Sequence, residues 1–95
     1  MSVARVYRMK AAPGRGDALA GAIERAAGGI RQADGCEGVT LLRGKEADDD
    51  MLFIERWATV EHHQGALNAM PPGTLDEIQA NLAGPPEGSY MDWLA

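Results

Sequence analysis

The spacing of apolar residues changes along the chain and so predicts its secondary structure. Residues 2–10 alternate apolar and polar positions, which is typical of a strand with one buried face. From Leu19 to Ala33 the apolar residues instead recur at helical spacing along one face. We expect Asp17 to cap the start of this helix and Gly35 to end it.

The second half of the chain supplies three more strands and two more helices. Residues 38–44 and 51–57 read as two strands joined by a polar hairpin loop. Thr59 is a good cap for a helix that follows, and the Pro71-Pro72-Gly73 run ends that helix. Because Thr74 is followed three residues later by Glu77, a capping box predicts a further short helix, and residues 89–94 complete the pattern as a strand.

The resulting order, β-α-β-β-α-(α)-β, is typical of an α+β, ferredoxin-like fold. It predicts an antiparallel sheet with the helices on one face and the other face uncovered. We expect the uncovered face to hold apolar residues such as Tyr7, Leu41 or Leu42, Phe53 or Ile54, and Trp57. Two such faces packed together would enclose a cavity, so we predict a homodimer. A helix histidine would reach that cavity only near an open edge of the sheet.

Composition narrows the class of protein. Ninety-five residues make a single domain, 1–95. The net charge of −5 argues against a nucleic-acid partner, because phosphate binding needs clustered Lys and Arg. No apolar run is long enough to cross a bilayer, so no membrane partner is expected. The single cysteine, Cys36, cannot form an internal disulfide, and a reducing cytoplasm is the expected location.

The stretch from Phe53 to His63 is where chemistry could be assembled. Val60, His63 and Leu67 recur along one face of the predicted helix, so His63 lies within the apolar arc while His62 falls outside it. A histidine in that position suits a general base near neutral pH. The alternative is a hydrogen-bonded structural residue, which is the commoner role of an imidazole on an apolar face.

The strands offer further candidates. Trp57 is expected to shape the site, although large aromatics at strand ends are usually core or interface anchors. Phe53 and Tyr7 are candidate substrate-binding residues. Arg5 and Arg43 could neutralise an anionic substrate, or simply occupy solvated strand positions.

Glu55 shares strand parity with Trp57. If it is buried without a cation, its pKa should rise, but pairing with an arginine, of the same chain or across the dimer, is the expectation. No metal site is expected, because the His62–His63 pair has no third ligand at metal spacing.

In this order and spacing, several features resemble one known family. They are the Pro13-Gly14 turn before the first helix, the Asp34-Gly35-Cys36 segment after it, the Glu55-Arg56-Trp57 strand end and the Thr59-Val60-Glu61 helix start. The chain resembles an antibiotic biosynthesis monooxygenase domain of the dimeric α/β-barrel superfamily. This resemblance implies the ferredoxin-like fold and a dimer. Some members oxygenate quinols or polyketide aromatics with O2 and without metal or flavin, and others degrade haem.

The haem-degrading members use a strand Asn, a strand Trp and a helix His. The Trp corresponds to Trp57, but the Asn position falls at about Tyr7 and the His position near Leu67, so two of three depart. The helix His of quinol-oxygenase members falls close to Ala66 and departs too.

Three functions remain open at this point. The first is a cofactor-independent monooxygenase that oxidises a quinol or polycyclic phenol in a cavity between sheet and helices, with His63 and Trp57 as catalytic residues. The second is a dimer of the same superfamily that binds a small aromatic ligand without catalysis. The third, disfavoured by the departures, is a haem-binding or haem-degrading protein.

Overall fold

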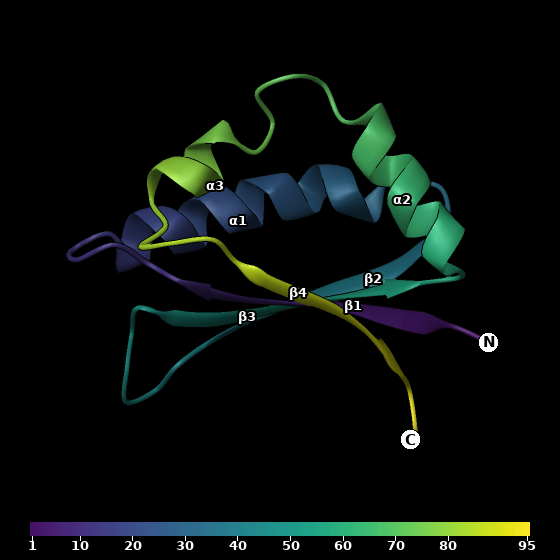
Figure 1. Ribbon diagram of the computed structural model, residues 1–95, viewed down its shortest axis with the longest axis horizontal. Coiled ribbons are helices and arrows are strands. Elements are labelled where there is room, and N and C mark those ends of the chain that lie inside the picture. Colours follow the sequence, from purple (N-terminus) through teal and green to yellow (C-terminus); the bar gives the residue numbers. More distant parts are fainter.

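A four-stranded antiparallel sheet with three helices on one side forms the fold, as Figure 1 shows for the computed structural model, which describes residues 1–95. The elements follow in the order β1 (Val3–Lys10), α1 (Gly16–Arg31), β2 (Cys36–Arg43), β3 (Asp50–Trp57), α2 (Val60–Ala69), α3 (Asp76–Ala80) and β4 (Glu87–Asp92). The strand order β2-β3-β1-β4 places the first and third strands at the centre. The predicted α+β, ferredoxin-like class is confirmed.

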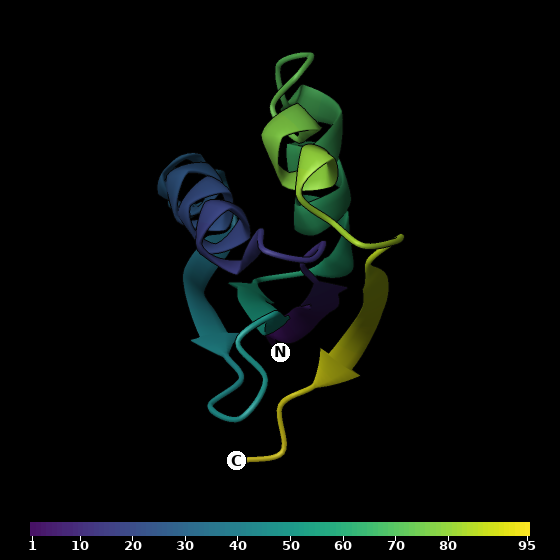
Figure 2. The same ribbon diagram turned by 90° about the vertical axis from the view of Figure 1, so that its left-hand side faces the viewer.

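The core lies between the sheet and α1. Leu19, Ile23 and Ile30 are buried at the helical spacing read from the sequence. They pack on β1 and β3 residues of one parity, among them Met51 and Phe53. In Figure 2, α1 lies above the strands on one side, and α2 and α3 lie above them on the other. The two sets of helices therefore cover the same face of the sheet.

Register decides which side chains meet the helices. Tyr7 pairs with Phe53, Arg5 with Glu55, and Val3 with Trp57, so these residues point to one face. That face is the helix-covered one, because Phe53 and Trp57 are part of the core. The expectation that Tyr7 and Trp57 lie on the uncovered face is therefore wrong, and of the paired alternatives it is Leu41 and Phe53 that lie on the covered face. Pattern alone shows which residues share a face and not which face the helices cover.

The uncovered face holds the alternate residues. Val6 pairs with Ile54, and Leu42 with Leu52, on the side away from the helices. Leu42 is 50% exposed and Met91 of β4 is 54% exposed. An apolar sheet face is therefore left without a covering layer, as the sequence predicted, but with Leu42 and Ile54 rather than their neighbours.

The helix caps were predicted with mixed success. Thr59 caps α2 as expected, its hydroxyl accepting a hydrogen bond from the His62 N–H. Asp17 lies inside the first turn of α1 and does not cap it, because its carboxylate accepts from Arg43 at 2.8 Å. Thr74 forms no capping box, since its hydroxyl donates to the Pro71 carbonyl and α3 begins two residues later.

Candidate functional site

His63 is the centre of a buried polar cluster. It is 2% exposed and is the only buried residue of α2, whereas Val60 is half-buried and Leu67 is 39% exposed. Its Nε2 lies 2.9 Å from the hydroxyl of Tyr7 on β1, and its Nδ1 lies 2.7 Å from the hydroxyl of Tyr90 on β4. Both ring nitrogens are therefore engaged. The predicted position of His63 on the inward face is confirmed.

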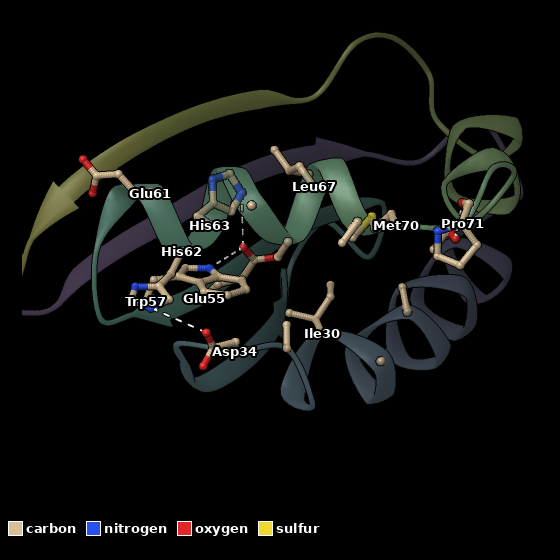
Figure 3. Close-up of a pocket in the computed structure, with 17 residues that line it drawn as sticks. Ile30, Asp34, Glu55, Trp57, Glu61, His62, His63, Leu67, Met70 and Pro71 are labelled. Carbon is tan, nitrogen blue, oxygen red and sulfur yellow. Dashed lines mark hydrogen bonds and ion pairs between the residues drawn. The ribbon is translucent and has the colours of Figure 1, made fainter.

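Glu55 and Trp57 extend this cluster along β3. Both are almost fully buried, at 4% and 1% exposed. The Trp57 indole N–H donates to Oε1 of Glu55 at 2.9 Å, and the same oxygen lies 3.7 Å from Nε2 of His63. Figure 3 marks both interactions with dashed lines. The indole also meets the imidazole edge-on, with ring centroids 5.6 Å apart. These three side chains form one contact group.

Arg5 supplies the positive charge of the cluster. Its guanidinium carbon lies 4.9 Å from the Tyr7 ring centroid and 4.5 Å from that of Tyr90. Arg5 thus makes cation–π interactions with both of the tyrosines that are hydrogen-bonded to His63. Arg5 forms no salt bridge with Glu55, its cross-strand neighbour, so no arginine of the same chain pairs with that carboxylate; a pairing across a dimer stays a prediction.

Burial shifts the proton affinities in this cluster. Loss of solvent raises the pKa of Glu55, and the Trp57 hydrogen bond and the Arg5 charge oppose that rise. Loss of solvent also lowers the pKa of His63, and the Arg5 charge lowers it further. The pKa of the Tyr7 hydroxyl is raised, again mainly by burial. The geometry therefore favours a neutral His63 beside a carboxyl group that holds its proton more tightly than usual.

A cavity of about 560 Å³ opens beside this cluster, between the sheet and the helices. Its walls come from one face of α1 and one face of α2, and its floor from β3 (Figure 3). The apolar wall residues are Ala26, Ile30, Ala33, Ala66, Leu67, Ala69 and Met70. Glu55, Trp57 and His63 line it from the sheet and α2. The volume lies within the range of small-molecule sites.

The rim of this pocket is acidic. Asp34 and Glu61 lie there, and no Lys or Arg is among the 17 lining residues. His62 is also at the rim, where its Nδ1 lies 2.7 Å from the Thr59 hydroxyl and its Nε2 lies 3.9 Å from the Asp34 carboxylate. An anionic ligand would therefore meet carboxylates and no fixed cation.

The predicted site residues differ in how close they lie to the pocket. His63 and Trp57 line it, whereas Tyr7 is hydrogen-bonded to His63 and Arg5 contacts the Tyr7 ring without lining the pocket. Phe53 is 4% exposed within the core and does not line the pocket. Arg43 is not brought to the pocket: its guanidinium binds Asp17 and the Asp48 carbonyl.

The position of the pocket also resolves a geometric difficulty. A cavity between two sheets would have been reached by a helix histidine only near a sheet edge. The pocket instead lies on the helix side, within one chain, and His63 lines it directly. The face assignment from the sequence was reversed, and correcting it places Trp57 and His63 in the same cavity.

Two members of the cluster were missing from the predicted site. Tyr90 is on the edge strand β4, and only the register opposite Arg5 brings its hydroxyl to His63. Glu55 was recognised as a buried candidate from its parity with Trp57, but it was not assigned to the site. Pairing between distant strands carries no local sequence signal, which explains the omission of Tyr90.

The donor set does not resemble a metal or haem site. No group of three or more His, Cys, Asp or Glu side chains is arranged to hold a metal ion. Both nitrogens of His63 are hydrogen-bonded, so neither is free to bind a haem iron. None of the helices has the length and apolarity needed to span a membrane.

Solved structures share the fold along nearly the whole chain. A putative antibiotic biosynthesis monooxygenase from Bordetella bronchiseptica matches with a TM-score of 0.87 and 21% identity, over 99% of this chain and 98% of that one. SnoaB, a cofactor-independent oxygenase from Streptomyces nogalater, matches with a TM-score of 0.83 and 22% identity, over 99% and 94%. Rv0793 from Mycobacterium tuberculosis matches with 0.81 and 18%, over 100% and 97%.

Sequence comparison identifies the family. Comparison with curated proteins gives no match. The model of the antibiotic biosynthesis monooxygenase family matches residues 2–80, which is most of the chain and includes every element up to α3. The chain therefore belongs to the antibiotic biosynthesis monooxygenase family.

Proposed function

We propose that this protein is a cofactor-independent monooxygenase that oxidises a quinol or polycyclic phenol with O2. The observation that carries the proposal is the buried His63, Glu55 and Trp57 group at the wall of a pocket whose helix walls are largely apolar. Family membership supports an oxygenase of this kind. SnoaB is a cofactor-independent oxygenase and has the same fold. At 22% identity, the similarity between the two proteins is one of fold.

The reaction balances without an added reductant. Removal of the phenolic proton leaves an electron-rich anion, which passes electrons to O2. One oxygen atom is bonded to a ring carbon that loses its hydrogen, and the other leaves as water. The product is the quinone, and the substrate supplies all four electrons. The protein contributes a base, a rigid pocket for a flat ring, and exclusion of water from the anion.

The charges around the pocket select a neutral substrate. Its lining carries Asp34, Glu55 and Glu61 and no cation. Arg43 is engaged by Asp17, and Arg5 is held between two tyrosine rings. The substrate is therefore an uncharged phenol or quinol rather than an anion, and Trp57 forms a wall that contacts its ring.

Replacement of His63 tests the catalytic centre. His63→Ala is expected to lower oxygen uptake with naphthols and hydroxyanthracenes by about a hundredfold or more, because it removes the imidazole from the polar cluster that supplies the base. His62→Ala is the matched control, since His62 lies at the rim and contacts Thr59 and Asp34; the expected loss is at most a few fold. Equal rates in His63→Ala and the parent, with the fold intact by circular dichroism, would remove His63 from the mechanism.

A non-catalytic binding protein is the second candidate. It is favoured by the engagement of both His63 nitrogens, which is also the pattern of a structural histidine. In that case the phenols would quench Trp57 fluorescence on binding but consume no oxygen. Oxygen uptake by the unaltered protein therefore separates the two functions.

The bare sheet face supports a homodimer as part of the proposal. Leu42, Ile54 and Met91 lie on this face without a covering layer, and a second copy would bury them. Light scattering at micromolar concentration should give twice the 10.1 kDa chain mass. A mass equal to one chain would contradict this assembly.

A cytoplasmic location, expected from the single cysteine, stays a prediction.

A further inference from the structure

Glu55 is a buried carboxylate in which one of the two oxygens has no hydrogen-bond partner. Its Oε1 accepts from the Trp57 indole, whereas Oε2 carries no hydrogen bond. No Lys or Arg forms a salt bridge with it, and it is 4% exposed while lining the pocket. A buried carboxylate without a salt bridge is costly, so its presence at the pocket wall points to a use for the free oxygen.

His63 offers no such free atom. A neutral imidazole has one donor nitrogen and one acceptor nitrogen, and the hydroxyls of Tyr7 and Tyr90 occupy both. A substrate hydroxyl could reach a His63 nitrogen only by displacing a tyrosine. Among the groups that line the pocket near the cluster, Oε2 of Glu55 is the acceptor already available.

We propose that Glu55 contacts the substrate hydroxyl and accepts its proton, with Trp57 holding the carboxylate by its hydrogen bond and His63 positioning it by packing beside it. This inference rests on the proposed monooxygenase function. In the step, the phenolic O–H bond breaks and an O–H bond forms at Oε2 of Glu55. The electron pair stays on the substrate oxygen, which gives the phenolate that reduces O2. Trp57 holds the other carboxylate oxygen in place, and His63 lies 3.7 Å from it.

The charges around Glu55 suit this role. From α2 it faces His63, whose pKa is lowered, so the neighbouring imidazole stays neutral. From β1 it faces Arg5 and Tyr7, and from β4 the Tyr90 hydroxyl is bonded to the same imidazole. Burial makes the ionised carboxylate a stronger base than a solvated one, while Arg5 limits the effect. Turnover should therefore fall as pH is lowered through the raised pKa of Glu55.

Binding without oxygen gives the first test. Under nitrogen, 1-naphthol and its methyl ether are titrated against quenching of tryptophan fluorescence, at a pH where Glu55 is ionised and with Trp93 replaced by Phe in both proteins, so that Trp57 is the remaining tryptophan. A hydrogen bond to a charged acceptor is stronger than one to a neutral acceptor. The parent protein should therefore prefer naphthol over the ether, and Glu55→Gln should reduce that preference about tenfold. An equal preference in both proteins would overturn the contact between Glu55 and the hydroxyl.

Turnover in air gives the second test. Glu55→Gln keeps an oxygen for the Trp57 N–H but loses the base, so kcat should fall about a hundredfold or more with KM changed only a few fold. The acidic limb of the pH profile should disappear with it. Glu55→Asp, which restores a carboxylate, should recover part of the rate. Glu46→Gln, the same change on the exposed hairpin between β2 and β3, is the matched control and should leave the rate unchanged.

The outcomes separate this inference from the proposed function. Oxygen uptake by the parent together with a Glu55→Gln rate within threefold of it would overturn the role of Glu55 and leave the oxygenase standing. A naphthol preference that Glu55→Gln abolishes, without oxygen uptake by the parent, would keep Glu55 as the hydroxyl-binding residue and remove the oxygenase. If Glu55→Gln loses both the naphthol preference and the rate of oxygen uptake, the role of Glu55 and the oxygenase function are both supported.

Discussion

Trp57→Ala is expected to lose most of the stability of the fold. Trp57 is 1% exposed and is the largest fully buried side chain. Truncation of a buried Trp to Ala costs about 3–5 kcal/mol, through lost burial and the cavity that remains. The Glu55 carboxylate also loses the N–H that it accepts from, which adds about 1–3 kcal/mol for an unpaired buried group. The sum is a large share of the ~5–15 kcal/mol of a typical domain.

A second variant separates packing from hydrogen bonding. Trp57→Phe keeps an aromatic ring in the core but removes the indole N–H, so it should cost less than the alanine variant. Urea unfolding followed by circular dichroism measures both. A loss of less than about 1 kcal/mol in the unfolding free energy of Trp57→Ala would show that Trp57 does not anchor the core.

Glu55→Gln is expected to gain stability relative to the parent as pH rises. Burial raises the pKa of Glu55 above its ordinary value of 4.5, so the folded chain holds this proton more tightly than the unfolded chain. Between 4.5 and the raised value, the unfolded state loses its proton first, and the parent becomes less stable with increasing pH. Each unit of the rise corresponds to about 1.4 kcal/mol. Glutamine does not titrate and avoids this loss.

Urea unfolding of both proteins at a series of pH values measures the effect. The difference in unfolding free energy should grow as pH rises from 4.5 to the raised pKa and then stay constant above it. The lowered pKa of His63 destabilises both proteins as pH falls below 6.5, so its contribution largely cancels in the difference. Parallel stability curves would show that Glu55 is not perturbed. The same substitution should remove turnover. Such a trade-off between stability and activity is expected where a buried, destabilising group is functional.

Periodicity predicted the elements and the fold, because helices and strands bury their apolar residues at different spacings. It also placed His63 on the inner face of α2. It could not decide which sheet face the helices cover, since either parity satisfies the alternation of β1 and β3. That choice depends on tertiary packing of α1 against Met51 and Phe53, and it was read the wrong way round.

The site was predicted only as far as local pattern reaches. Trp57 and His63 lie six residues apart, at a strand end and the helix that follows, so their proximity was readable. Tyr90 meets His63 through strand pairing across the sheet, which no local pattern encodes. Arg43 was a reasonable candidate as a strand cation, but Asp17 of α1 lies near enough to hold it.

Oxygen labelling tests the central claim most directly. The parent protein, treated with a chelator, is incubated with a neutral hydroxyanthracene or naphthol under ¹⁸O2, and the product is examined by mass spectrometry. One labelled oxygen atom in the quinone, with one O2 consumed per quinone formed, is the result expected of a cofactor-independent monooxygenase. Absence of product, or a quinone whose new oxygen comes from water, would contradict it.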